Sequence, residues 1–85
     1  MGGVQYDQTS VASGGTYTLQ TKNAMLTANQ SYSWSGFVVL IENGVMTVKF
    51  SDTRYTFNFA YNNGEFSFTN PTALGGAISL YIYYE

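Results

Sequence analysis

The chain has 85 residues, contains neither cysteine nor histidine, and carries charge on 9% of its residues with a net charge of −2. Its length suits one small domain, and its composition excludes disulfides and the Cys and His ligands of zinc and most transition metals. Nucleic-acid binding needs a basic patch, which three scattered cations do not provide. We therefore expect no cofactor, no metal and no nucleic-acid partner.

The first residues of the sequence and its longest apolar stretch also indicate where in the cell the protein is located. The longest apolar stretch, residues 37–41, is far too short to cross a bilayer, so we expect no membrane partner. The first residues lack the basic and apolar regions of a signal peptide. The sequence thus predicts a protein that stays in the cytoplasm or leaves the cell by assembly or lysis.

The chain begins with a polar segment that contains Gly2-Gly3 and Ser13-Gly14-Gly15. We expect residues 1–15 to form a flexible or partner-ordered arm, and residues 16–85 to form one domain. Residues 16–19 and 25–26 are predicted as short strands. The apolar spacing nowhere follows a helical period.

A four-stranded antiparallel meander is predicted for residues 32–42, 45–51, 54–62 and 65–70. The connections are Asn43-Gly44, Asp52-Thr53 and Asn63-Gly64, and Asn-Gly is a strong signal for a two-residue hairpin turn. Two-residue turns fix the register and place every facing pair on one side of the sheet. The predicted pairs are Ile41/Met46, Val39/Val48, Phe37/Phe50, Phe50/Tyr55, Val48/Phe57, Met46/Phe59, Tyr61/Phe66 and Phe59/Phe68.

The last strand is predicted over residues 77–84, with apolar or aromatic side chains on both sides, so we expect both of its faces to be covered. The chain as a whole is predicted to be all-β: a small antiparallel β-sandwich or barrel of about six to seven strands built around the meander. Val38 and Leu40 interrupt the polar side of the meander. Together with Tyr81 and Tyr83 they form a candidate oligomer interface, unless a second sheet closes over them.

Catalysis is not expected. Without His or Cys the usual nucleophilic triads are absent. In a flat sheet the two glutamates beside the Asn-Gly turns, Glu42 and Glu65, would lie about 14 Å apart, as three strand spacings give. Glycosidase carboxylates stand roughly 5–10 Å apart. We therefore expect a non-enzymatic protein.

A candidate ligand surface gathers at two places. One end of the meander collects amides and carboxylates that could hold sugar hydroxyls or a weak calcium ion, although Asn also serves turn geometry alone. Strict alternation places Tyr32 and the single tryptophan, Trp34, on the polar face, whereas a bulge at Ser35-Gly36 would turn them into the core. Core or interface packing is the favoured interpretation of Trp34, and an exposed sugar-stacking platform is the alternative. The residues at the meander's end are Glu42, Asn43, Asn62, Asn63 and Glu65.

The polar, Gly- and Ser-rich lead-in, the aromatic meander and the final strand Ala77-Ile78-Ser79-Leu80-Tyr81-Ile82-Tyr83-Tyr84 resemble a known class of domain. They are similar to the small β-sandwich tips of bacteriophage tail fibres, head fibres and virion decoration proteins, over residues 16–85. The resemblance implies a trimer located on the virion that binds surface polysaccharide or other virion proteins. It is one of style, without a residue motif, so it transfers no site residue.

Three functions are therefore predicted, in this order. The first is a virion structural or host-recognition module that works as a homo-oligomer, which low charge and edge strands without lysine or proline guards favour. The second is a monomeric carbohydrate-binding domain that uses Trp34 and the turn asparagines. The third is an adaptor or inhibitor that pairs an edge strand with a host protein.

Overall fold

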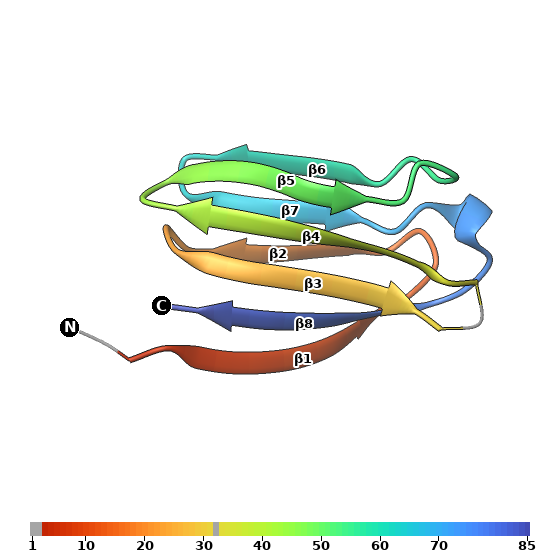
Figure 1. The fold of residues 1–85 in the computed structure, drawn as a ribbon, viewed down its shortest axis with the longest axis horizontal. Coiled ribbons are helices and arrows are strands. Elements are labelled where there is room, and N and C mark those ends of the chain that lie inside the picture. Colours follow the sequence, from red (N-terminus) through yellow and green to blue (C-terminus); the bar gives the residue numbers. More distant parts are fainter. Residues whose placement is uncertain (1–2, 32) are drawn as a thin grey trace.

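The computed structural model describes residues 3–31 and 33–85, and within them the chain is an all-β sandwich of two antiparallel sheets (Figure 1). A single turn of 3-10 helix, η1 (Thr72–Leu74), precedes the last strand. The strands are β1 (Gln5–Val11), β2 (Thr16–Gln20), β3 (Ala24–Gln30), β4 (Ser35–Glu42), β5 (Val45–Ser51), β6 (Asn58–Asn62), β7 (Glu65–Thr69) and β8 (Ile78–Tyr84). The predicted sandwich is thus confirmed, with more strands than expected. Among the described residues no helix is long and apolar enough to cross a membrane.

The sheets divide the predicted meander in two. The larger sheet has the order β1-β8-β3-β4-β5, and the smaller one has the order β2-β7-β6. The β4–β5 and β6–β7 hairpins are confirmed, and their Asn43-Gly44 and Asn63-Gly64 turns have positive φ at both positions, as a type I′ turn requires. The predicted third hairpin is wrong. Residues 52–57 carry the chain from one sheet to the other, so β5 and β6 do not pair.

The predicted register is correct beside the two Asn-Gly turns and wrong further along the strands. Ile41/Met46, Val39/Val48, Tyr61/Phe66 and Phe59/Phe68 face each other as predicted. Between Val38 and Val39 the register shifts, because Val38 faces Phe50 while Val39 faces Val48. Lys49 is therefore the extra residue of a β-bulge, and the predicted Phe37/Phe50 pair is wrong. The three pairs predicted across residues 52–53 are wrong because their strands lie in different sheets.

The core lies between the two sheets and is aromatic at its centre. Phe37 on β4 packs against Phe57, Phe59 and Phe68, with ring centroids 4.7–5.4 Å apart. Aliphatic side chains of the larger sheet surround this cluster, and all are at most 1% exposed. They are Leu26, Val39, Ile41, Ile78, Leu80 and Ile82. Burial of this kind is the main stabilising contribution in so small a domain.

The predicted arm is wrong for Gln5–Val11, which forms β1 and pairs with β8 along all seven residues. These residues show little apolar periodicity, so the backbone hydrogen bonds to β8 define the strand more than its side chains do. A buried amide secures the end of β1. The Asn70 Nδ2 group donates to the carbonyl oxygens of Val11 (3.1 Å) and Gly76 (2.9 Å).

The expectation that both faces of the last strand are covered is also wrong within this chain. Ile78, Leu80 and Ile82 point into the core and are fully buried. Tyr83, on the other face of β8, is 45% exposed. The smaller sheet packs on one side of the larger sheet only, so the opposite side, here called the outer face, is left open.

Candidate functional site: an aromatic groove on the outer face

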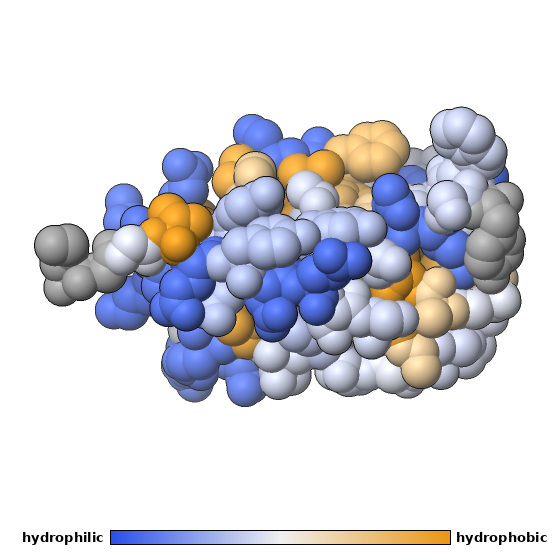
Figure 2. Space-filling view, turned by 90° about the horizontal axis from the view of Figure 1, so that it is seen from below, coloured by the Kyte–Doolittle hydropathy of each residue, from blue (hydrophilic) through white to orange (hydrophobic). Residues whose placement is uncertain are grey.

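The outer face of the larger sheet brings the predicted interface residues together. Val38 and Leu40 on β4 face Thr27 and Met25 on β3, which in turn face Tyr81 and Tyr83 on β8. Val38 and Tyr81 therefore belong to one cross-strand row, and Leu40 and Tyr83 belong to the adjacent row. A β3 residue lies in the middle of each row. The surface that they share is apolar and aromatic. Seen from below, from the side on which β1 lies, the molecule is mostly hydrophilic with scattered hydrophobic residues (Figure 2).

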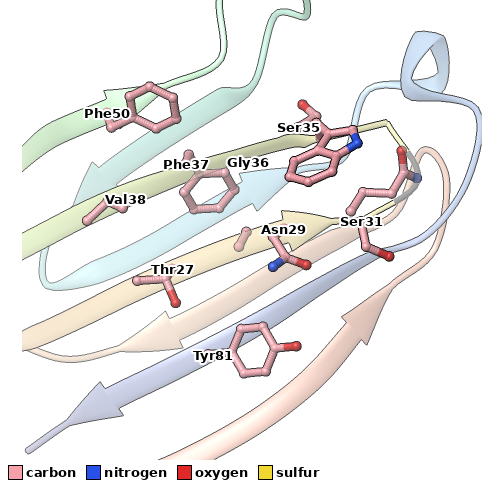
Figure 3. Close-up of a pocket in the computed structure, with 12 residues that line it drawn as sticks. Thr27, Asn29, Ser31, Ser35, Gly36, Phe37, Val38, Phe50 and Tyr81 are labelled. Atoms are coloured by element: carbon pink, nitrogen blue, oxygen red, sulfur yellow. The ribbon is translucent and has the colours of Figure 1, made fainter.

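A groove of about 440 Å³ crosses this outer face near the ends of β3 and β4. Its central row runs over four strands, from Phe50 on β5 through Val38 and Thr27 to Tyr81 on β8 (Figure 3). Phe50 and Tyr81 stand at the two ends of this row, and the smaller Val38 and Thr27 lie between them. The large-small-small-large order makes the row a trough with an aromatic wall at each end.

The next row lowers the floor of the groove further. Gly36 faces Asn29 there, and a Cβ at Gly36 would lie 2.1 Å from the carbonyl oxygen of Ala28. Only glycine fits this close approach of β3 and β4. The Asn29 amide and the Thr27 hydroxyl consequently lie at the floor, where they offer hydrogen-bonding groups between the aromatic walls (Figure 3).

Trp34 lines the same groove and is 90% exposed, so the predicted packing in the core is wrong, whereas packing in an interface stays a prediction. Its φ of +56° lies in the left-handed region, where a side chain as bulky as tryptophan is rarely found. That conformation costs about 1–2 kcal/mol for a residue other than glycine. Exposing an indole forgoes the stabilisation that its burial would bring. Both penalties fall on one residue, and this favours a role in binding over a role in folding.

An ion pair holds the turn that presents Trp34. The Arg54 Nη2 group donates to the carbonyl oxygens of Ser33 (2.7 Å) and Trp34 (2.9 Å), and also to Asp52 Oδ2 at 2.8 Å. Asp52 Oδ1 accepts from the Arg54 backbone N–H at 3.0 Å, which forms an Asx turn beside the ion pair. The Arg54 side chain, by its hydrogen bonds, lowers the pKa of Asp52 from 3.8 to about 2. The pair thus fixes the backbone on both sides of the exposed indole.

The bulge supplies the second aromatic wall. In an unbroken register Lys49 would face Val38, and Phe50 would face Phe37 inside the sandwich, as predicted. Because Lys49 is bulged out of the ladder instead, Phe50 faces outward beside Val38 and is 59% exposed. Phe50, Thr27 and Asn29 are therefore groove residues that the sequence pattern did not identify.

The remaining predicted ligand residues lie elsewhere. The two Asn-Gly turns sit at the opposite end of the sandwich from the β3–β4 connection that carries Trp34 (Figure 1). The Asn43 backbone N–H donates to Asn23 Oδ1, and the Asn63 carbonyl oxygen accepts from the Gln20 side chain, in keeping with a structural role. Tyr32 lies outside the described residues. The other residues predicted there, Asn62, Glu42 and Glu65, are exposed.

Glu42 and Glu65 belong to different sheets, so the distance expected for a flat sheet does not apply to them. Within residues 3–31 and 33–85 no three His, Cys, Asp or Glu side chains gather in a group that could hold a metal ion. Comparison with protein-family models, with curated proteins and with solved structures gives no significant match. The groove is therefore the feature of the molecule that points to a function.

Proposed function

We propose that this chain is a non-enzymatic carbohydrate-recognition module whose ligand binds in the outer-face groove. The observation that carries the proposal is Trp34, which is exposed, left-handed in its backbone and fixed by the Asp52–Arg54 pair. A turn held in this way is preorganised, so binding does not have to order its backbone.

The chemistry of the groove fits a sugar. A pyranose ring has an apolar face of C–H bonds that packs on the electron-rich face of an aromatic ring, and a periphery of hydroxyls that need hydrogen-bond partners. Trp34, Phe50 and Tyr81 supply the aromatic surfaces. Asn29 and Thr27 supply the amide and hydroxyl groups. Ligand sites generally combine apolar walls with a few placed polar groups in this way.

The proposal is tested by glycan binding to the whole chain. We expect immobilised glycans to capture the protein, and the replacement Trp34→Ala to weaken capture at least roughly tenfold, which corresponds to 1.4 kcal/mol of binding free energy. Tyr6→Ala is the matched control, because Tyr6 lies on the outer face but does not line the groove. Equal capture of the Trp34→Ala variant, with its fold verified by circular dichroism, would overturn the proposal.

The second candidate function is the homo-oligomeric virion module that the resemblance implies. The specific observation in its favour is the other part of the outer face, where Tyr6, Met25 and Tyr83 are each at least 41% exposed and the rings of Tyr6 and Tyr83 lie 4.9 Å apart. Exposed apolar surface of this kind often marks an interface. Light scattering on a sizing column measures the native mass. A trimer that the replacement Met25→Lys dissociates would support this function, and a monomer at all concentrations would exclude the interface.

A further inference from the structure

We infer that the ligand of the groove is a neutral, linear glycan chain that lies across the strands, from Phe50 on β5 to Tyr81 on β8. The inference depends on the proposed carbohydrate recognition and specifies the charge, the length and the direction of what is bound. Each of these three properties follows from a separate feature of the groove.

The neutral charge follows from the lining. Among the described residues that line the groove, none is charged. Arg54 contacts the Trp34 turn, but its guanidinium already donates to Asp52 and to two carbonyl oxygens, so it is not free to bind an acidic ligand. A carboxylate or sulfate held against aromatic walls would lose hydration without gaining a charged partner, which is unfavourable. The uncharged hydroxyls of a neutral sugar need only the hydrogen bonds that Asn29 and Thr27 offer.

The direction follows from the register. Phe50, Val38, Thr27 and Tyr81 form one continuous row across four strands, so a ligand that contacts both aromatic walls has to lie at right angles to the strands. Trp34 lies beyond the Gly36/Asn29 row, on the side of the strand ends. An extended ligand that follows the floor therefore touches both walls and passes beside the indole.

The length follows from the strand spacing. Phe50 and Tyr81 are separated by three strand spacings, or about 14 Å. A single pyranose ring is too short to reach both walls, whereas a chain of several sugar units reaches from one to the other. Each wall then contributes its own stacking contact to an oligosaccharide, and a monosaccharide gains at most one of them. Affinity should accordingly rise with chain length until the groove is filled.

The test uses chemically matched hexasaccharides. One set consists of neutral hexamers of glucose, mannose, galactose and N-acetylglucosamine, and the other of the corresponding hexamers of glucuronate, mannuronate and galacturonate. Trp34 is the single tryptophan of the chain, so its fluorescence reports on the groove directly. We expect at least one neutral hexamer to shift this emission and to bind roughly tenfold more tightly than its acidic counterpart and than its own monosaccharide.

Two groove variants and one control establish the direction. Phe50→Ala and Tyr81→Ala should each weaken binding of the neutral hexamer several-fold, because each removes one wall, and Tyr83→Ala should leave it unchanged. Acidic hexamers that bind as tightly as neutral ones, or monosaccharides that bind as tightly as hexamers, would overturn this inference while leaving carbohydrate recognition intact. A Trp34 emission that responds to no sugar of either set would overturn the proposed function together with the inference.

Discussion

Arg54 shows how one side chain can determine the geometry of a site that it does not line. Its guanidinium joins the carboxylate of Asp52 to the carbonyl oxygens of Ser33 and Trp34, across a turn that has left-handed backbone. A planar group with several N–H donors suits this arrangement, and a lysine ammonium does not reproduce it. The indole is exposed because the backbone beneath it is fixed.

We expect the replacement Arg54→Lys to loosen the Trp34 turn while leaving the fold intact. The charge is retained, but one ammonium cannot reach all the acceptors of the guanidinium, so the fluorescence anisotropy of Trp34 should fall. Sugar affinity should fall roughly three- to tenfold, since a ligand would then have to order the turn. Lys22→Arg, a comparable exchange outside the groove, is the control. Unchanged anisotropy in Arg54→Lys would show that the guanidinium does not hold the turn.

The same ion pair predicts a pH dependence. The pKa of Asp52 is lowered to about 2, chiefly by its hydrogen bonds with Arg54, so the folded state favours the ionised carboxylate. A group with a lowered pKa contributes its full stabilisation above the pKa of the unfolded chain and loses it as the pH falls through the folded value. The contribution is therefore complete above about pH 4 and lost between about pH 4 and 2.

Acid titration of Trp34 anisotropy measures this loss. We expect the anisotropy to be constant from neutral pH to about pH 4 and then to decrease toward pH 2. Asp52→Asn should remove the transition, because its amide does not titrate. A decrease centred near neutral pH would contradict the assignment to Asp52.

At the scale of the strand, the bulge at Lys49 has the largest effect on the site. It reverses the direction of one aromatic side chain, and it also interrupts the free edge of the larger sheet, where a bulge and a lysine both discourage pairing with another chain. The sequence predicted edge strands without a lysine or proline that would prevent such pairing. The β5 edge instead has both a lysine and a bulge.

Deleting Lys49 should restore the regular pairing of β4 with β5 while Phe50 stays opposite Val38, because Phe50 then directly follows Val48, the partner of Val39. Phe50 would keep its outward position, and binding of a neutral hexasaccharide should change by no more than roughly twofold. Phe50→Ala, which removes the wall itself, is the contrasting variant and should weaken binding several-fold. Amide exchange and near-ultraviolet circular dichroism would verify that each variant keeps its packed core. A loss of binding after deletion of Lys49 as large as that of Phe50→Ala would contradict this account of the register.

The strand pattern illustrates which parts of the fold and site are readable from sequence. The two Asn-Gly hairpins were predictable because the turn residues need left-handed backbone, and the alternation beside them fixes the register locally. The bulge was not, since Lys49 differs in no obvious way from any other polar strand residue. Nor was the change of sheet at residues 52–57, because a turn of this composition closes a hairpin equally well. The pairing of β1 depends on hydrogen bonds to β8, whose residues follow their β1 partners by 67 (Val11/Ile78) to 79 (Gln5/Tyr84) positions, and no local pattern contains them.

The candidate site was predictable to the same extent. The apolar patch of Val38, Leu40, Tyr81 and Tyr83 was identified, since alternation alone places these residues on one face. Trp34 was identified as important, but its exposure depends on contacts with Arg54, which lies 20 residues further along the chain. Phe50 was assigned to the wrong face as a direct result of the missed bulge.

At the scale of the whole molecule, Asn70 joins four strands. It is fully buried, its side-chain amide serves the end of β1 and the segment before β8, and its backbone groups bond to Gly14 and Gly15, which precede β2. It directly follows β7. The two sheets are thus connected by polar contacts at one end as well as by the aromatic core.

We expect Asn70→Ala to lower the free energy of unfolding by roughly 2–4 kcal/mol, because one buried and one part-buried carbonyl oxygen lose their donor and a small cavity forms. Urea denaturation measures the change. Asn58→Ala, at an exposed position of β6, is the control and should have little effect. Amide exchange should accelerate first in β1, whose end depends on the Asn70 side chain. A loss no larger than that of the control would show that Asn70 does not connect the sheets.

The start of β1 and the end of β8 lie together, because Gln5 of β1 faces Tyr84 of β8. They are at the same end of the sandwich as the Asn-Gly turns, whereas the β3–β4 connection with Trp34 is at the other end (Figure 1). A fluorophore, an affinity tag or a solid support attached to either terminus would therefore stand away from the groove. The domain could be immobilised on a sensor through its ends with the indole pointing into the flowing sample, and a short linker between the ends would allow a circularly permuted version to be opened elsewhere.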